Sequence, residues 1–175
     1  MTKKIYADTN LVSRLSDAFY GNDPQISDDV AAALLKICNC DVEIVTSKEM
    51  LDEVLKTVNL KQRALLVLLA TLAAKVPFSR VSFLTPTPWG GAAWGSVPWA
   101  GITEKTDPRL VQLCGIFDPA DARHIFQAST NQCDYFLTFD RKTILSRASK
   151  HSEVMEDLCP DMKFVSPEEL SAILD

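Results

Sequence analysis

Residues 4–10 read Lys4-Ile5-Tyr6-Ala7-Asp8-Thr9-Asn10, a short apolar run that is followed by three polar residues. Such a run predicts a buried strand that leads into a polar loop and then a helix. Asp8 would then lie at the carboxyl end of the strand. In a parallel sheet this end is the edge where ligands bind. The stretch therefore predicts both the start of a sheet and the first residue of a site.

Strand-like runs and helical patterns alternate along the rest of the chain. After the first strand we expect strands at 43–46, 81–84, 135–138 and 163–165. Helices are expected after caps at Ser27, Ser47 and Ser166, and after the Asp-Pro pairs at 107–108 and 118–119. The alternation predicts an α/β fold in which helices cover both faces of a parallel sheet. With 175 residues, the chain is expected to form one domain, 1–175.

The charge balance restricts the kind of nucleic-acid partner. The chain has 18 Lys and Arg against 23 Asp and Glu, which gives a net charge of −5. This excess of acids argues against a coat protein that binds nucleic acid nonspecifically through Lys and Arg. It does not exclude an enzyme that acts on nucleic acid, because clustered acids can bind a metal ion that attracts phosphate.

Cysteine usage and the apolar segments favour a cytoplasmic protein without a membrane span. The five cysteines contain no C-x-x-C pair, and the spacing of Cys38 and Cys40 is wrong for a zinc knuckle, so we expect no zinc site. The N-terminal apolar run is too short for a signal peptide. The most apolar stretch, 64–74, has about half of the ~20 residues that a membrane span needs.

Two segments are unusual. Residues 60–75 are predicted to form a helix that is apolar all round, which is either enclosed by its own domain or shared with a partner subunit. Residues 85–106 are rich in Pro and Gly and form a predicted loop insertion that carries Trp89, Trp94 and Trp99. These tryptophans either stack on unpaired bases or anchor the loop on the domain or on a partner subunit.

Two acids directly follow strand-like runs and are expected at the carboxyl edge of the sheet. Asp8 follows the first of these runs, and Asp140 follows residues 135–139. Both side chains would overhang the edge of the sheet, where they could reach a common ligand. The alternative is that each acid only caps the end of its strand.

Two further acids lie in the opening turns of helices. Glu53 is about two helical turns beyond the second strand, and Glu49, one turn earlier, could take its place. Asp121 follows the Asp118-Pro119 helix start. Asp118 competes with it for the same role, and an acid at this position also stabilises the helix dipole.

The convergence of four carboxylates predicts a metal site. Without a cation, these side chains would repel one another and be costly to keep ionised in a partly dry site. Oxygen ligands without Cys and His clusters favour Mg²⁺ or Mn²⁺. Such an ion polarises a phosphodiester and lowers the pKa of a bound water molecule. Phosphodiester hydrolysis is the chemistry that this pattern predicts.

Four motifs occur in order: strand-D-T-N at 8–10, S-x5-E at 47–53, D-A-x-H-I-x-x-A at 121–128 and C-D-Y-F-L-T-x-D at 133–140. Together they resemble the PIN-domain family of metal-dependent nucleases, which includes the VapC-like toxins. The resemblance spans nearly the whole chain, which would be a PIN-like domain. It implies a three-layer α/β/α fold with a five-stranded sheet of order 3-2-1-4-5, and single-stranded RNA as the usual substrate. The loop at 85–106 departs from the family pattern.

The resemblance also implies roles for individual residues. By position, the metal-binding acids would be Asp8, Glu53, Asp121 and Asp140. Asn10 and Thr138 would support them through hydrogen bonds, and Thr9 is a further residue of this kind.

Residues beside these motifs have less specific roles. His124 follows Asp121 by three residues, and we expect a satisfied, partly buried histidine rather than a site residue. The basic side chains after Asp140 either bind substrate phosphates or form a solvated face. These are Arg141, Lys142, Arg147 and Lys150.

The expected function is therefore that of a Mg²⁺- or Mn²⁺-dependent endoribonuclease that uses an activated water and no covalent intermediate. One alternative is a phosphatase with Asp8 as nucleophile, although Asn10 stands where such enzymes usually have an acid. Another is a PIN-like scaffold that binds RNA or protein without cutting. A toxin of a toxin–antitoxin pair is a narrower hypothesis. An antitoxin, or a second copy in a homodimer, would dock on the apolar segment 65–72.

Overall fold

The chain folds around a parallel sheet. The computed structural model describes residues 2–19, 26–59, 63, 66, 74–75 and 107–174. Within them the strand order is β3-β2-β1-β4-β5, and every pairing is parallel. The strands are β1 (Lys3–Ala7), β2 (Val42–Thr46), β3 (Ala74–Lys75), β4 (Tyr135–Leu137) and β5 (Lys163–Val165). Because β3 contributes only two residues at one edge, the other four strands make up most of the sheet.

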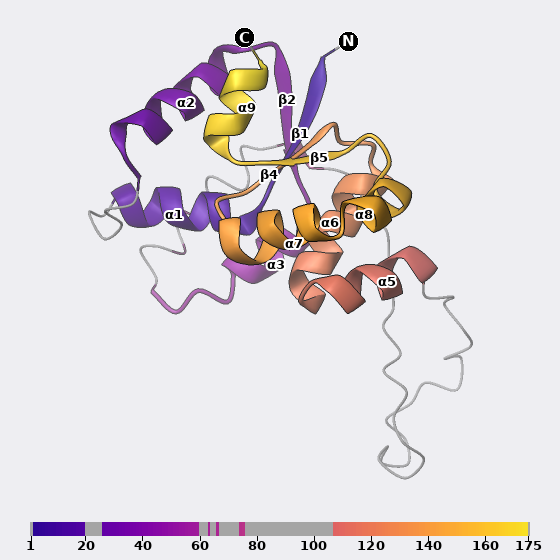
Figure 1. Ribbon diagram of the computed structural model, residues 1–175. Helices are drawn as coiled ribbons and strands as arrows, with labels where there is room; N and C mark the ends of the chain where they lie inside the picture. The colour runs from indigo at the N-terminus through magenta and orange to yellow at the C-terminus, as the bar shows by residue number, and fades with distance from the viewer. Residues whose placement is uncertain are drawn as a thin grey trace.

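Helices cover both faces of this sheet (Figure 1). One side carries α1 (Thr9–Phe19), α2 (Asp28–Asn39) and α9 (Pro167–Ile173). The other side carries α5 (Pro108–Ile116), α6 (Pro119–Thr130), the π-helical turn η1 (Arg141–Leu145), α7 (Ser146–Lys150) and α8 (Ser152–Leu158). The short helix α3 (Lys48–Val54) follows β2 and contacts α1 and α6. The expected α/β class with a parallel sheet is confirmed.

Alternation along the central strands creates two cores. In β1, Ile5 and Ala7 pack towards α1, α2 and α9, whereas Tyr6 packs towards α5 and α6. The Tyr6 ring stacks on Phe136 of β4, with ring centroids 5.4 Å apart and planes 11° apart. Phe164 of β5 continues the row at 5.5 Å from Phe136. A parallel sheet buried on both faces requires such near-continuous apolar strands.

Most of the expected helix caps are present. The Ser27 hydroxyl accepts a hydrogen bond from the Val30 amide at the start of α2. Ser166 and Glu169 form a complete capping box at the start of α9. Ser47 stands at the N-cap of α3 but makes no capping bond, because its hydroxyl lies 2.6 Å from that of Tyr6. The capping role expected of Ser47 is therefore wrong.

The segment after β2 differs most from the sequence expectation. Ala74 and Lys75 form β3, so the helix predicted at 60–75 does not continue to its expected end. Leu66 is buried with Val12, Met50 and Val54 of its own chain. At this residue, enclosure by the domain is the correct alternative. The rest of the segment 65–72 lies outside the described residues, as do the predicted strand 81–84 and the loop 85–106.

Two other local expectations also fail. The helix expected after Ser47 is short: α3 ends at Val54, and the apolar residues Leu55 and Val58 that follow it are exposed. The sequence reasoning did not predict α8, whose Met155 and Leu158 are buried in the core.

Across the described part of the chain, none of the helices combines the length and the apolar character needed to cross a bilayer.

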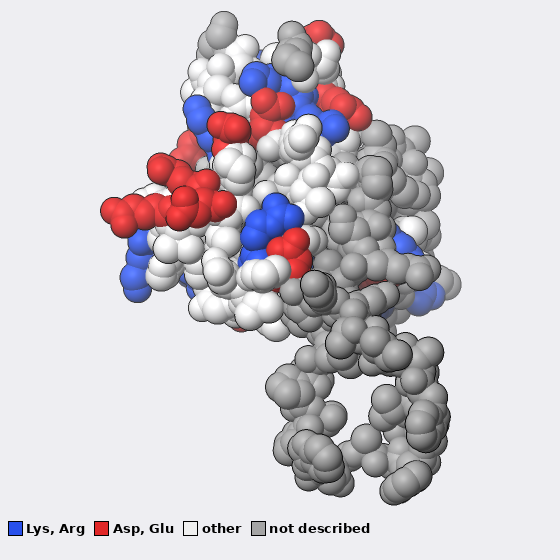
Figure 2. All heavy atoms as spheres, turned by 90° about the vertical axis from the view of Figure 1, so that its right-hand side faces the viewer, with Lys and Arg blue, Asp and Glu red and all other residues white. Residues whose placement is uncertain are grey.

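Charged side chains of both signs share the surface on one side of the molecule. Figure 2 views it from the right-hand side of Figure 1, and there the described Lys and Arg side chains stand among Asp and Glu side chains. This mixture differs from the broad basic face that nonspecific nucleic-acid binding requires.

The capping box of α9 gives a stability prediction. We expect Ser166→Ala to lower the free energy of unfolding by about 1 kcal/mol, because the Glu169 amide loses its partner. Ser149→Ala, at an exposed position of α7, should change it by less than about 0.5 kcal/mol. Urea unfolding of both variants measures the difference, and equal effects would contradict the prediction.

Candidate metal centre

Asp8 is the most buried acid at the carboxyl edge of the sheet. Its side chain follows β1, and the residue is 3% exposed. The Thr138 hydroxyl, just beyond β4, donates a hydrogen bond of 2.7 Å to Asp8 Oδ2. Burial raises the pKa of Asp8 above its ordinary value, while the charge of His124 and the Thr138 hydrogen bond oppose this shift. The sequence expectation that Asp8 lies at a strand end and Thr138 supports it agrees with this geometry.

The same threonine connects Asp8 to Asp140. The Asp140 amide donates to Thr138 Oγ1 at 3.0 Å, so one hydroxyl contacts both acidic residues. The Asp140 carboxylate accepts from the Thr143 amide at 2.8 Å and also bonds the Thr143 hydroxyl. Burial raises the pKa of Asp140, but the bonds from Thr143 outweigh it and hold the pKa below its ordinary value. Asp140 thus caps the following turn η1, a structural role that differs from the strand-end cap considered as the alternative to metal binding.

Asp121 lies near both of these acids. It is half-buried in the first turn of α6, whereas its competitor Asp118 is exposed at the N-cap. Burial, followed by the negative charges of Asp8, Asp118 and Asp140, raises the pKa of Asp121 to about 6. The mutual repulsion that was expected of converging carboxylates is therefore present at Asp121.

Of the two glutamates of α3, Glu53 contacts His124, whereas Glu49 acts on it through charge. Its Oε2 lies 3.1 Å from His124 Nε2, and its side chain is 28% exposed. Burial raises the pKa of Glu53, but the hydrogen bond and charge of His124 outweigh it, so the pKa is lowered. The choice between the two glutamates, left open by the sequence, depends on this contact.

A chain of buried polar groups holds His124 in place. Its Nδ1 lies 2.7 Å from the Tyr6 hydroxyl, which in turn lies 2.6 Å from Ser47 Oγ. Thr9 Oγ1 is 3.3 Å from His124 Nε2. Burial lowers the pKa of His124, but the bond to Glu53 outweighs it and the pKa is raised. His124 is satisfied as expected, but it is fully buried rather than partly buried.

His124 also contacts a candidate ligand, Glu53. Its position three residues after Asp121 on α6 was evident from the sequence, but a satisfied histidine was favoured over a site residue, and the contact with Glu53 was not anticipated. Tyr6 and Ser47 were likewise assigned only structural roles, as strand and cap. Their contact links the end of β2 to the middle of β1.

The residues present fit Mg²⁺ or Mn²⁺ in ligand chemistry, because they offer hard carboxylate oxygens. A cation would also relieve the repulsion that Asp121 feels from the neighbouring acids. Asn10 Oδ1 is a buried oxygen without a hydrogen-bond partner among the described residues, so the support expected of Asn10 is not seen. Among those residues, no three His, Cys, Asp or Glu side chains lie close enough to enclose one ion. Glu53 and Asp140 would have to exchange His124 and Thr143 for an ion.

A polar cleft of about 560 Å³ adjoins this centre. Its lining residues come from α1, α2, α9 and the segment around Asp140; they are Asn10, Arg14, Ser27, Val30, Phe139, Asp140, Arg141, Lys142 and Glu168. The sequence reasoning anticipated Arg141 and Lys142 but missed Arg14 and Glu168. Arg147 instead donates to the Ile116 carbonyl at 3.1 Å. Trp89, Trp94 and Trp99 lie outside the described residues.

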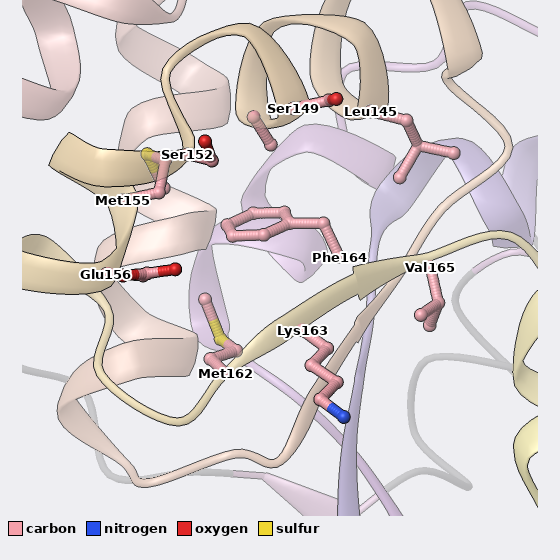
Figure 3. A pocket seen from close by; sticks show the side chains of 10 residues that line it. Leu145, Ser149, Ser152, Met155, Glu156, Met162, Lys163, Phe164 and Val165 are labelled. Carbon is pink, nitrogen blue, oxygen red and sulfur yellow. The ribbon is translucent and has the colours of Figure 1, made fainter.

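A second hollow, of about 360 Å³, lies between β5 and the helices α7 and α8 (Figure 3). Phe164 projects into it, and Met155, Met162 and Leu145 surround the ring. None of the four candidate metal ligands lines this hollow.

No family model matches the sequence, and no curated protein matches it either.

The bond between Thr138 and Asp8 gives a second stability prediction. Thr138→Val keeps the side-chain shape but leaves the buried Asp8 carboxylate without a hydroxyl donor. We expect the free energy of unfolding to fall by about 1 to 3 kcal/mol at neutral pH. Thr130→Val, at an exposed position near the end of α6, is the matched control and should have little effect. Equal unfolding midpoints for the two variants would show that the bond is dispensable.

The raised pKa of Asp121 predicts that removal of its charge increases the free energy of unfolding in a pH-dependent way. A group whose pKa is raised on folding stabilises the protein below its unfolded pKa, and this contribution is lost as the pH rises through the folded pKa. For Asp121 that window runs from 3.8 to about 6. We expect Asp121→Asn to stabilise the metal-free protein by about 1 kcal/mol near pH 7.5, after discounting for solvent, and to have no effect near pH 3.5.

Unfolding in EDTA at several pH values measures this gain. Asp52→Asn, at an exposed position of α3, serves as the control and should show no such pH dependence. A gain of equal size at both ends of the pH range would rule out the electrostatic explanation.

Proposed function

We propose that this protein is a PIN-like endoribonuclease that hydrolyses phosphodiester bonds of single-stranded RNA with Mg²⁺ or Mn²⁺. One observation carries the proposal. At the carboxyl edge of a parallel sheet, the Thr138 hydroxyl bonds both Asp8 and Asp140, and the charges of these two acids act on Asp121. This edge is where α/β proteins bind their ligands. Perturbed carboxylates gathered there are more typical of a functional site than of a surface.

The fold gives the proposal further support. The parallel sheet with helices on both faces supports it, and the strand order β3-β2-β1-β4-β5 is compatible with the order that the PIN resemblance implies. The third strand is shorter and earlier in the chain than expected, at Ala74–Lys75. A cytoplasmic location belongs to the same proposal.

In this proposal the residues around the acids have distinct tasks. Asp8, Glu53, Asp121 and Asp140 would hold the ion, which supplies polarisation of the phosphodiester and a water of lowered pKa. Thr138 orients Asp8 through its hydrogen bond, and His124 orients Glu53 through the contact between Nε2 and Oε2. Mutation of such supporting residues typically lowers metal affinity or activity by about 10- to 100-fold.

A non-cutting scaffold is the second candidate, and a specific observation favours it. Glu53 and Asp140 each already have a partner, and the acids do not enclose an ion in the described arrangement. Calorimetry that finds no binding of Mn²⁺ would support this alternative. A covalent phosphatase is less well supported, because Asp8 is buried and hydrogen-bonded and Asn10 is not an acid. The toxin role, the antitoxin and the homodimer remain proposals about partners.

Cleavage of single-stranded RNA in the presence of Mn²⁺ tests the proposed function. We expect the wild type to cut the RNA and Asp8→Asn to be slower on the order of 100-fold or more, because a ligand for the ion is lost. Asp52→Asn removes an exposed acid next to Glu53 and should keep the wild-type rate. Similar cleavage by wild type and Asp8→Asn would contradict the assignment.

A second readout separates an inactive nuclease from a scaffold. Mn²⁺ should raise the unfolding temperature of the wild type more than that of Asp8→Asn, since a ligand that binds only the folded state stabilises it. If Mn²⁺ stabilises neither protein and RNA stays intact, the scaffold is the better description.

A further inference from the structure

The cleft beside Asp140 has a composition that suits an anion. Three of its lining residues are cationic, namely Arg14, Arg141 and Lys142, and two are acidic, namely Asp140 and Glu168. Asp140 already uses its carboxylate to cap η1. The cations therefore exceed the acids at a place that borders the candidate metal centre.

The cations of the cleft come from two separate segments. Arg14 lies on α1, and its guanidinium is 5.8 Å from the centre of the Phe139 ring. A guanidinium over an aromatic face is held in orientation by a cation–π interaction. Lys142 is exposed in η1, directly after Arg141. A ligand in the cleft would thus contact charges on both sides.

Glu168 of α9 binds one of these cations. Arg141 Nη2 donates to Glu168 Oε1 at 2.7 Å, and the two side chains are 66% and 37% exposed. Glu168 Oε2 is buried and has no hydrogen-bond partner among the described residues. The contact therefore uses one carboxylate oxygen rather than two. Exposed ion pairs of this kind are weak and exchange readily with another anion.

Carboxylate and phosphate present similar oxygen pairs to a guanidinium. We propose that the cleft binds a backbone phosphate of the single-stranded substrate, held by Arg14, Arg141 and Lys142, and that Glu168 occupies Arg141 until the phosphate displaces it. This inference rests on the proposed function and adds to it the side from which the strand approaches. The strand lies over α1, η1 and α9. Glu168 acts as an internal competitor that weakens binding.

The second hollow provides a contrast. Among its lining residues Lys163 is the one cation, its side chain points away from the Phe164 ring, and the walls of the hollow are mainly apolar (Figure 3). Lys163 begins β5, at the end of the strand opposite to the carboxyl edge. It therefore offers a matched control for loss of a positive charge outside the cleft.

Fluorescence anisotropy in EDTA tests the inference without cleavage. The probe is a labelled single-stranded RNA of about ten nucleotides, within the usual range of single-strand site sizes. We expect Lys142→Gln to weaken binding and to reduce the slope of log K against log salt by about 0.7, the value for one phosphate contact on a single strand. Lys163→Gln should leave both quantities unchanged. Equal effects of the two lysine variants would overturn the cleft as the binding site.

Glu168→Gln is the decisive variant because its effect has the opposite sign. It should tighten binding by up to about fivefold, since an exposed ion pair no longer competes for Arg141. The capping box uses Ser166 and Glu169, so α9 keeps its start. When Arg141→Gln is already present, adding Glu168→Gln should increase RNA affinity much less than it does in the wild type. Weaker or unchanged binding in Glu168→Gln, or an undiminished gain in the double variant, would overturn the competition.

The outcome is separable from that of the cleavage experiment. RNA that binds in EDTA with these charge effects but is not cut with Mn²⁺ would support the cleft and contradict the nuclease. RNA that is cut, with binding insensitive to Lys142 and Glu168, would support the nuclease and overturn the cleft.

Discussion

The buried carboxylate of Asp8 is the constraint around which the carboxyl edge of the sheet is arranged. A charge removed from water is costly unless hydrogen bonds or opposite charges compensate for it. Thr138 supplies a hydrogen bond from the neighbouring strand end, and His124 supplies opposite charge. The parallel register makes the first contact possible, because Ala7 pairs with Leu137 and the residues that follow them meet at the edge.

Core packing and site geometry share one residue, Tyr6. Its ring stacks on Phe136 in the middle of the sheet, while its hydroxyl contacts His124 and Ser47. His124 in turn contacts Glu53. The orientation of a candidate ligand on α3 therefore depends on how β1 packs against α6. A buried polar chain of this kind is favourable only when each member has a partner.

The acids around the centre have partners within the chain. Glu53 contacts His124, Asp140 contacts Thr143, and Glu168 contacts Arg141. Such pairings limit the repulsion that is still evident at Asp121. In the proposed function these same partners are exchanged for an ion or for a substrate phosphate. Exchange is easiest for the exposed pair between Arg141 and Glu168, because solvent already screens it.

Local sequence signals were sufficient to predict those strands and helix caps that depend only on a residue and its neighbours in the chain. The strand before Asp8, the cap at Ser27 and the capping box at Ser166 were predictable because hydrophobic period and capping act over a few residues. The α/β class followed from the alternation of such elements. The same reasoning failed at Ala74–Lys75, where pairing with β2 overrides a helical pattern. It failed at Ser47 because a distant hydroxyl, that of Tyr6, competes for its side chain.

By itself, the sequence determined the strands β1, β2, β4 and β5 and the acids Asp8 and Asp140 that follow two of them, since both depend on neighbouring residues. Only the tertiary structure decided that Glu53 of α3 contacts His124, that His124 is fully buried, and that Arg14 and Glu168 share a cleft with Asp140. These outcomes depend on contacts between residues that are far apart in the chain, such as Tyr6 with His124 and Arg141 with Glu168. Packing brings those partners together, and no local pattern records it.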